Sequence, residues 1–435
     1  MIENTSQKIF QLAKLLWPLN RSLSGKDTVK TLSILKKTFK NLKIKRINSG
    51  KKVFDWQIPE EWQIKDAWIK DENKKVILDF KKNNLSIVGY SIPVNKVIDL
   101  KSLKKKLYSL PDQPNAIPYV TSYYKKDWGF CMSYNKKKKL KNKNYHVFID
   151  SKFKKGHLHY GEILLKGKSK KEIFLSTYIC HPSMANNELS GPCLTIFLSK
   201  WIASIKDRYY SYRIIFIPET IGSIFYIRNN LKSLKKNVQA GFVITCVGDQ
   251  RTFSYLPSRK GNTLSDQVSK HVLKWYTKKY KKYTWLDRGS DERQYCWPGI
   301  DLPISSVMRS KYGSYPEYHT SLDKLGKVVT KKGLSESYSL YQKIILNLEK
   351  NYKYISNTLC EPFLSKRNLY SNLSIKNNNY NSKIILDILS YCDGKHSLLD
   401  ISDKLNMSSE IVYRNIKNLI KLKLIKKKKL KINNL

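Results

Sequence analysis

Four apolar runs in the middle of the chain are each bordered by polar residues of the kinds that bind ligands. The runs are 173–179, 213–217, 241–247 and 302–308. Short, continuous apolar runs are typical of strands that are buried on both faces of a parallel sheet. The carboxyl ends of such strands share one edge of an open α/β sheet, where ligands bind. The pattern therefore predicts an α/β fold with a site at that edge.

The residues that border these runs include candidate metal ligands and acids. His181 follows the first run, Glu219 the second, and His319 comes after the fourth, while Asp291 stands ahead of the fourth. Histidine and carboxylate side chains are common metal ligands. We therefore expect these side chains to meet, although a single histidine at a strand end is more often structural.

The segments on either side of the first run differ in character. Residues 1–43 have helical periodicity, whereas 44–135 are short, aromatic and β-like, which predicts a small β-rich domain. Its aromatic residues are expected mainly in its core, with substrate contact as the alternative. Residues 145–149 and 158–165 predict a β-ribbon. Residues 1–43 and 136–365 together are expected to form the α/β domain.

The C-terminal part of the chain predicts a further domain. Residues 366–381 form a polar, asparagine-rich linker. Residues 382–435 contain three helical segments and two short apolar strands that flank Lys426–Lys429, which is the pattern of a winged helix-turn-helix domain. Its third helix offers Arg414 and Lys417 to DNA. Such domains also serve only for packing, so DNA is a less favoured partner.

The net charge of +48 invites a nucleic-acid interpretation. However, only 12 of the 82 basic residues are arginine, and the lysines are spread along the whole chain together with many asparagines and isoleucines. This composition favours an AT-rich genome over selected polyanion binding, although nonspecific, salt-sensitive binding would still follow.

Other features of the composition indicate a cytoplasmic protein without a membrane partner. No apolar run approaches the roughly 18–20 residues of a membrane span, and the N-terminus lacks the pattern of a signal peptide. The seven cysteines are odd in number and form no CxxC pair, so we expect them to be reduced.

Long motifs of this chain resemble those of the polysaccharide biosynthesis proteins with an aminopeptidase-like domain, a DUF2172/DUF4910-type family. The motifs are DWQIPEEW at 55–62, IPY at 117–119 with Tyr123 and Tyr124, WGFC at 128–131, CHPSMANNELSG at 180–191 and YHTSLD at 318–323. The resemblance runs nearly end to end. It implies an M28 aminopeptidase-like mixed sheet with helices on both faces, an inserted small β-rich domain and a C-terminal winged helix.

The same resemblance implies functional residues. It assigns the metal ligands His181, Asp291 and His319, and the general base Glu219. Asn187 and Thr220 stand where this pattern has carboxylates that ligate a pair of metals. Because both are neutral, they would not offset two adjacent dications. We therefore expect one zinc ion, with Asn187 or Glu188 completing or orienting the site.

The expected function is a mononuclear zinc hydrolase that cleaves an amide in a small peptide or an amino-sugar-like substrate. The name of the resembled family implies a role in surface polysaccharide biosynthesis. The candidate substrate-binding residues are Asn187, Arg259, Arg293 and Tyr318. Two alternatives stay open: a regulatory protein whose degenerate site senses a ligand and whose winged helix binds DNA, and a scaffold that has lost its chemistry. The sequence also leaves a homo-oligomer open.

Overall fold

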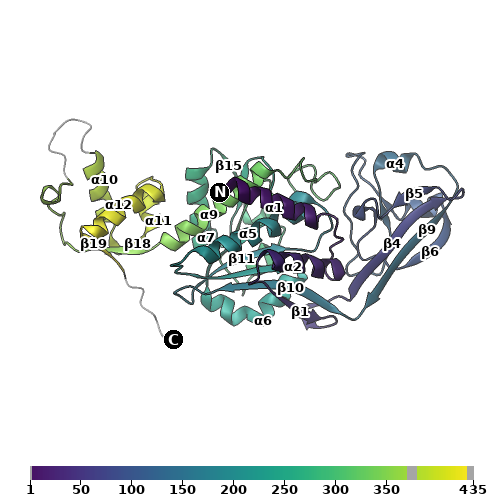
Figure 1. Cartoon of the computed structure of the whole chain (residues 1–435), viewed down its shortest axis with the longest axis horizontal. Coiled ribbons are helices and arrows are strands. Elements are labelled where there is room, and N and C mark those ends of the chain that lie inside the picture. Colours follow the sequence, from purple (N-terminus) through teal and green to yellow (C-terminus); the bar gives the residue numbers. More distant parts are fainter. Residues whose placement is uncertain (1, 370–379, 429–435) are drawn as a thin grey trace. The chain divides into compact units, whose positions relative to one another are not determined.

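The computed structural model describes residues 2–369 and 380–428 (Figure 1). The chain separates into two compact units. The first comprises Met1–Asp266 and Lys279–Ser339, and the second comprises Gln267–Lys278 and Leu340–Leu435. No helix of the described residues is both long and apolar enough to cross a membrane.

The first unit is organised around a mixed sheet that has eight strands within the described residues. The strand order is β1 (Lys43–Asn48), β10 (His157–Leu165), β12 (Ser211–Ile217), β11 (Glu172–Tyr178), β13 (Val238–Val243), β16 (Ile304–Met308), β14 (Phe253–Leu256) and β15 (Tyr280–Lys282). The four central strands run parallel and are almost entirely buried. They coincide with the four apolar runs, which confirms the predicted α/β sheet.

Helices pack against both faces of this sheet (Figure 1). Helices α1 (Ile2–Leu16), α2 (Lys26–Thr38) and α5 (Ser190–Ser204) contact one another, and α6 (Ile221–Asn237) lies across the sheet from them. Helix α5 begins directly after the loop that follows β11, and α6 begins directly after the loop that follows β12. Each of these strand-to-helix loops therefore presents its residues at the carboxyl edge of the sheet.

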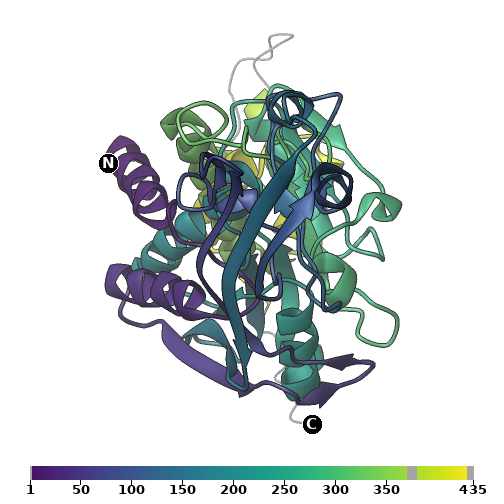
Figure 2. The ribbon, with the colours of Figure 1, turned by 90° about the vertical axis from the view of Figure 1, so that its right-hand side faces the viewer.

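The β-rich domain is built on a second sheet of long strands, coloured blue in Figure 2. Its strand order is β5 (Val76–Asp79), β4 (Glu61–Asp71), β9 (Asn144–Lys154) and β6 (Val94–Asp99). The predicted boundary at residue 135 is therefore too early, because β9 belongs to this sheet. The predicted β-ribbon is also wrong, because β9 pairs with β4 and β6 while β10 pairs with β1 and β12. The alternating pattern of β9 defines an inward face but not a partner strand.

The second unit contains the winged-helix elements. Helices α10 (Tyr380–Ser390), α11 (Leu398–Lys404) and α12 (Ser409–Lys421) pack with a small sheet in the order β18 (Asp393–Ser397), β17 (Lys353–Ser356) and β19 (Ile425–Lys427). Because β17 belongs to this sheet, the domain begins before the predicted residue 382. Most of the predicted linker, and the second predicted wing strand at 430–432, lie outside the described residues.

A close approach of α5 to the sheet depends on Gly191. A β-carbon at this position would lie 2.5 Å from the backbone oxygen of Ile244 and 2.6 Å from Thr177 Oγ1. We expect Gly191→Ala to lower the free energy of unfolding by about 1–3 kcal/mol, because the backbone atom cannot move aside cheaply. Urea unfolding measures the change. The exposed Lys200→Ala on the same helix is the control and should change stability by less than about 0.5 kcal/mol; equal stability of the two variants would contradict the prediction.

Candidate active site

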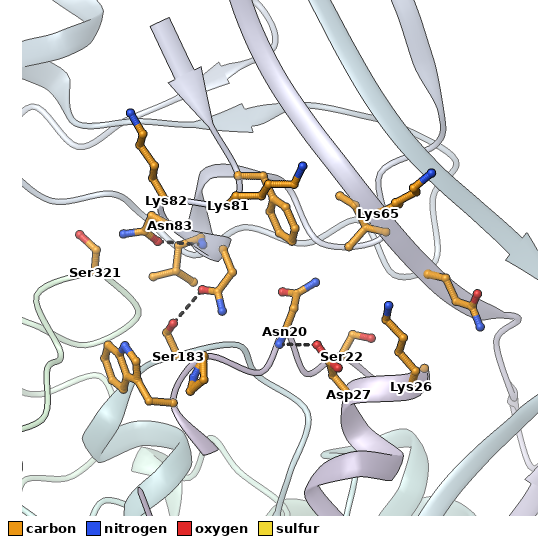
Figure 3. A pocket seen from close by; sticks show the side chains of 18 of the residues that line it. Asn20, Ser22, Lys26, Asp27, Lys65, Lys81, Lys82, Asn83, Ser183 and Ser321 are labelled. Atoms are coloured by element: carbon orange, nitrogen blue, oxygen red, sulfur yellow. Dashed lines mark hydrogen bonds between the residues drawn. The ribbon is translucent and has the colours of Figure 1, made fainter. Parts of the chain in front are cut away.

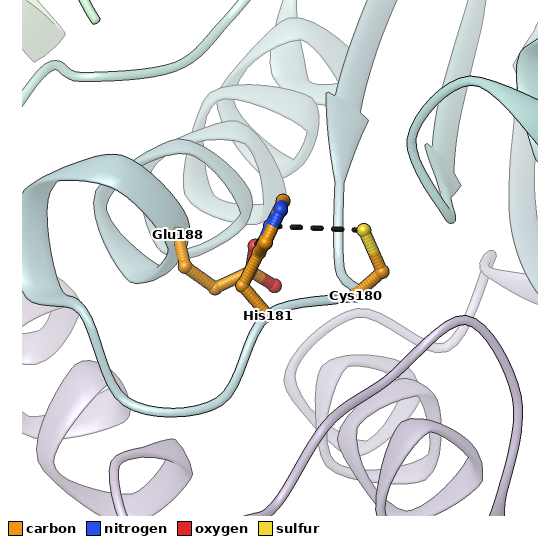
Figure 4. Close-up of side chains that lie close together, drawn as sticks. All are labelled: Cys180, His181 and Glu188. Carbon is orange, nitrogen blue, oxygen red and sulfur yellow. Dashed lines mark hydrogen bonds and ion pairs between the residues drawn. The ribbon is translucent and has the colours of Figure 1, made fainter. Parts of the chain in front are cut away.

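His181 lies in the loop between β11 and α5, and its ring is buried and held from one side. Its Nδ1 lies 2.8 Å from Glu188 Oε2, and Cys180 Sγ lies 3.7 Å from the same nitrogen (Figure 4). Because the carboxylate accepts the Nδ1 proton, the other ring nitrogen, Nε2, is left to face the pocket. Glu188 thus has the orienting role that was one of its two predicted roles.

Arg21 pins this loop from the segment that follows α1. Its buried guanidinium donates to the backbone oxygens of His181 at 3.0 Å and Ser183 at 3.4 Å, and it lies 3.4 Å from Glu188 Oε1. Arg21 was not among the predicted site residues. It lies between α1 and α2, in a connecting segment where an arginine is usually exposed, and only its contacts with a segment 160 residues away reveal its role.

Glu219 faces the free nitrogen of His181. It follows β12, and its Oε2 lies 3.7 Å from His181 Nε2. Its Oε1 accepts a hydrogen bond from Ser290 Oγ at 2.7 Å. Burial raises the pKa of Glu219 above its usual value, which is the direction that suits a carboxylate acting as a proton acceptor.

Asp291 provides a second buried carboxylate beside Glu219. Its Oδ1 accepts hydrogen bonds from the backbone N–H of Thr220 and from Ser223 Oγ, both at 2.8 Å. Its Oδ2 is buried and has no hydrogen-bond partner among the described residues. Burial, and then the charge of Glu219, raise the pKa of Asp291 to about 7. An unpaired carboxylate oxygen beside another acid is an environment that a cation would stabilise.

His319 approaches His181 from the loop that follows β16. The two imidazole centroids are 5.7 Å apart, and the ring of Tyr119 contacts both at 5.2 Å. Tyr318 stacks on His319 at 3.9 Å. Burial, and then the neighbouring His181, lower the pKa of His319 to about 3, so its imidazole is neutral and able to act as a ligand.

The β-rich domain holds this last loop in place. The backbone N–H of Tyr119 donates to the oxygen of His319 at 2.8 Å, and Pro118 forms an isolated bridge with Thr320. The motif that contains Tyr119 stood out in the sequence, but nothing in the sequence showed that it would reach the histidine loop from another domain.

A pocket of about 260 Å³ opens over these groups. It is lined by His181, Glu219, Thr220 and Arg293 and, from other segments, by Leu23, Trp56, Tyr123, Tyr124 and Cys180. The aromatic side chains of Trp56 and Tyr124 are 37% and 57% exposed and make an edge contact at 5.5 Å. These two rings are therefore part of the pocket rather than of a domain core, which was the less favoured expectation for aromatics of this domain.

The predicted substrate-binding residues take different positions. Arg293 lines the pocket and donates to Thr220 Oγ1 at 2.7 Å. Tyr318 packs on His319, as described above. Asn187 is buried; its amide nitrogen donates to Tyr178 Oη at 2.9 Å, and its Oδ1 has no hydrogen-bond partner among the described residues.

Arg259 is not brought to this pocket. Its guanidinium pairs with Asp301, and it does not line the pocket. The prediction gave Arg259 a substrate-binding role, but β14, the strand that precedes it, runs antiparallel to β16. Residues that follow β14, such as Arg259, therefore lie near the start of β16, at the opposite edge.

Backbone strain also gathers at the site. Ser183, Thr220 and His319 have φ angles of 47°, 64° and 53°, in the left-handed region that residues other than glycine seldom adopt. All three stand in the loops after β11, β12 and β16. Such strain persists where surrounding contacts hold it, and it is frequent at functional sites.

The donor set fits one cation better than two. Asp291 Oδ2 is unpaired, His319 is neutral, and Glu188 occupies the Nδ1 side of His181, which leaves Nε2 as its ligand atom. In the structure the ligand atoms of these three residues do not all lie within 4.8 Å of one another. A second cation would need a carboxylate at the position that Thr220 occupies. The hydroxyl of Thr220 already accepts a hydrogen bond from the cationic Arg293. A second metal ion there would face an arginine and no compensating charge.

A competing group of potential ligands was not predicted. Cys180, His181 and Glu188 have ligand atoms within 4.8 Å of one another (Figure 4). These atoms surround the Nδ1 side of the imidazole, where the proton is donated to Glu188. Burial raises the pKa of the Cys180 thiol to about 11, so the sulfur stays protonated and is a poor ligand. We therefore interpret this group as the support that orients His181.

Solved structures place this architecture in a known class. The structure is similar to a zinc aminopeptidase from Bacillus subtilis, with a TM-score of 0.59, 12% identity and coverage of 80% of this chain and 95% of that one. It is also similar to a peptidase M28 precursor from Shewanella amazonensis, with a TM-score of 0.56, 11% identity and coverage of 83% and 97%. The fold is therefore that of the M28 aminopeptidases.

The chain belongs to the family of the domain of unknown function DUF4910, whose model matches residues 10–351, and a winged helix-turn-helix model matches 352–427. A Clostridium acetobutylicum protein named as a polysaccharide biosynthesis protein with aminopeptidase-like domain is 41% identical over 421 residues, which are 96% of this chain and 95% of the relative. A crystal structure from the same organism, described as a peptidase, has a TM-score of 0.92 and 39% identity and covers 98% of this chain and 97% of its own.

Measurements of zinc affinity distinguish the predicted ligands, His181, Asp291 and His319, from the group formed by Cys180, His181 and Glu188. We expect His319→Ala to weaken zinc binding by at least about 100-fold, since it removes a predicted ligand. Cys180→Ser, which changes only the supporting group, should weaken binding by less than about threefold. Competition titration with a chelating dye, together with elemental analysis of the purified proteins, provides both values. The reverse order would show that the cysteine side of His181 is the ligand side.

Proposed function

We propose that this protein is an aminopeptidase-like amide hydrolase that uses one zinc ion. The observation that carries the proposal is the approach of Glu219 Oε2 to 3.7 Å from His181 Nε2, with Asp291 beside Glu219 and the ring of His319 beside that of His181. His181, Asp291 and His319 would hold the metal. When bound, zinc would supply Lewis acidity toward water and a carbonyl oxygen.

The chain's own residues would handle the proton and the substrate. Glu219 is placed to accept a proton from the attacking water and to return it to the leaving amine, because its raised pKa brings it closer to neutral pH. Ser290 holds one oxygen of Glu219, so the other points toward His181. The buried walls exclude bulk water and strengthen each of these electrostatic contacts.

The pocket favours an amide substrate that carries both a flat or apolar face and a negative or strongly polar group. Trp56 and Tyr124 offer exposed aromatic surface at the pocket, and Arg293 offers a cation within it. A small peptide or an acylated amino sugar has these features. The name of the Clostridium relative supports the second, so we propose that the substrate belongs to polysaccharide biosynthesis.

The winged helix is better explained as a packing domain than as a DNA reader. The first turn of α12 is bonded to α7 (Leu264–Tyr276) and α9 (Lys331–Lys350): the backbone N–H of Ser409 donates to His271 Nε2 at 3.0 Å, and Ser409 Oγ bonds Asn347. Tyr276 Oη also donates to Glu410 at 3.2 Å. In helix-turn-helix proteins this end of the recognition helix contacts base edges. The packing therefore disfavours the regulatory alternative.

Replacing the proposed base tests the hydrolase proposal. We expect Glu219→Gln to lower kcat for a suitable amide by about 10²–10⁴-fold, because proton acceptance is lost while size is kept. Zinc content and thermal unfolding should stay close to those of the wild type. Amide cleavage can be followed with aminoacyl 4-nitroanilides and with N-acetylated amino sugars. Wild-type protein that binds no zinc, or a variant with unchanged kcat, would contradict the proposal.

Zinc affinity should fall as the pH is lowered. Asp291 has a pKa of about 7, so below that pH a proton must leave before the carboxylate can bind a metal. Between pH 8 and pH 6 we expect the affinity to decrease by at least about tenfold, as measured by calorimetry in buffers of different ionisation enthalpy. Asp291→Asn should bind zinc more weakly and show a shallower pH dependence. Equal affinity at the two pH values would exclude Asp291 as a ligand.

A further inference from the structure

A second, larger cavity lies beside the pocket just described. Its volume is about 780 Å³, and it is bordered by the segment after α1, the start of α2 and the β-rich domain (Figure 3). The same two segments border both spaces. In the first segment Ser22 lines this cavity and Leu23 lines the pocket; in the second, Ser183 lines this cavity and His181 lines the pocket. None of the proposed metal ligands and no part of the proposed base, Glu219, lines this cavity, so it is a separate space.

Positive charge surrounds the cavity without matching negative charge. Six lysines line it, namely Lys14, Lys26, Lys65, Lys81, Lys82 and Lys324, against one carboxylate, Asp27. Lys81 pairs with Asp66, and the other five lysines have no carboxylate partner within ion-pair distance among the described residues. One oxygen of Asp27 is already engaged, since Oδ2 accepts a hydrogen bond from the backbone N–H of Asn20 at 2.8 Å.

Because the whole chain is rich in lysine, charge alone would not define a ligand. The same cavity also has aromatic walls, with the half-buried Trp17 and Phe80, and a set of amide side chains from Asn20, Asn83 and Asn84. Figure 3 shows Lys26 and Asn20 extending from the lower wall toward the β-rich domain. Aromatic faces accept the apolar face of a sugar ring, amides bond its hydroxyls, and lysines bind phosphate or carboxylate.

One contact joins the cavity wall to the loop of the proposed active site. Ser183 Oγ donates to Asn84 Oδ1 at 2.7 Å, so the β-rich domain and the His181 loop close this end of the cavity together (Figure 3). This end of the wall is therefore ordered by the native fold, whereas the six lysines around the cavity are exposed. A volume of this size falls in the range of sites for small ligands and accommodates one or two sugar rings with an anionic group.

We propose that this cavity is a binding site for a sugar that carries an anionic substituent, either a phosphate ester or a carboxylate. The lysines supply the charge, Trp17 and Phe80 supply the face against which the ring packs, and the asparagines supply directional hydrogen bonds. The site is separate from the hydrolytic pocket, and the proposal does not depend on the hydrolase assignment.

Calorimetric titration of the full-length protein at low ionic strength tests the site. The probes are glucose 1-phosphate, glucuronic acid, glucose and inorganic phosphate. We expect at least one of the two anionic sugars to bind about tenfold more tightly than both glucose and inorganic phosphate, a difference of about 1.4 kcal/mol. The tighter of glucose 1-phosphate and glucuronic acid identifies the anionic group. Binding of inorganic phosphate as tight as that of the anionic sugars would overturn the proposal, as would no binding.

Matched variants separate the cavity from the bulk charge of the protein. Lys26→Gln with Lys82→Gln should weaken the anionic sugar by about tenfold, whereas Lys36→Gln with Lys37→Gln, which removes the same charge from exposed positions outside the cavity, should weaken it by less than about threefold. Equal losses in the two double variants would overturn the proposal.

Two further variants locate the ligand. Trp17→Leu should weaken the anionic sugar but leave inorganic phosphate unchanged, because it removes only the ring contact. Glu219→Gln should leave the affinity for the anionic sugar unchanged. Loss of binding in Glu219→Gln would move the ligand to the hydrolytic pocket and overturn the proposal, even if the hydrolase assignment were correct.

Discussion

The buried chain of contacts from Arg21 through Glu188 to His181 is the interaction on which the site depends. Arg21 lies within ion-pair distance of Glu188, and Glu188 in turn orients the imidazole of His181. Removing one partner would leave a buried charge uncompensated, which costs about 3–5 kcal/mol in comparable pairs. The same guanidinium also binds two backbone oxygens of the loop, so orientation of the ring and shape of the loop are determined together.

Charge balance around that ring then limits what the pocket can hold. Glu219 and Asp291 bring two buried carboxylates together, His319 stays neutral, and Arg293 is a fixed cation beside Thr220. A single divalent ion held by His181, Asp291 and His319 would relieve the repulsion between the acids. A second ion would have to displace Arg293 from a position that offers it only a hydroxyl. The arrangement of this M28-type fold is therefore suited to one metal ion.

The β-rich domain contributes residues to both the pocket and the larger cavity. Tyr119 contacts both histidine rings and its backbone holds the His319 loop, while Trp56 and Tyr124 line the smaller pocket. On its other side, Asn84 binds Ser183 at the wall of the larger cavity. Residues of one domain thus form walls of both hollows.

The sequence by itself determined the strands and the residues that follow them, because several short, continuous apolar runs are typical of a parallel sheet covered on both faces, whose carboxyl edge then collects His181, Glu219 and His319. It did not determine strand partners or direction, and so the place of β9 and the exclusion of Arg259 from the pocket were decided only by the tertiary structure. Arg21 and Tyr119 likewise gained their roles from contacts between segments far apart in the chain. Local patterns record which face of an element is buried, whereas partners across long separations are selected by the packing of the whole fold.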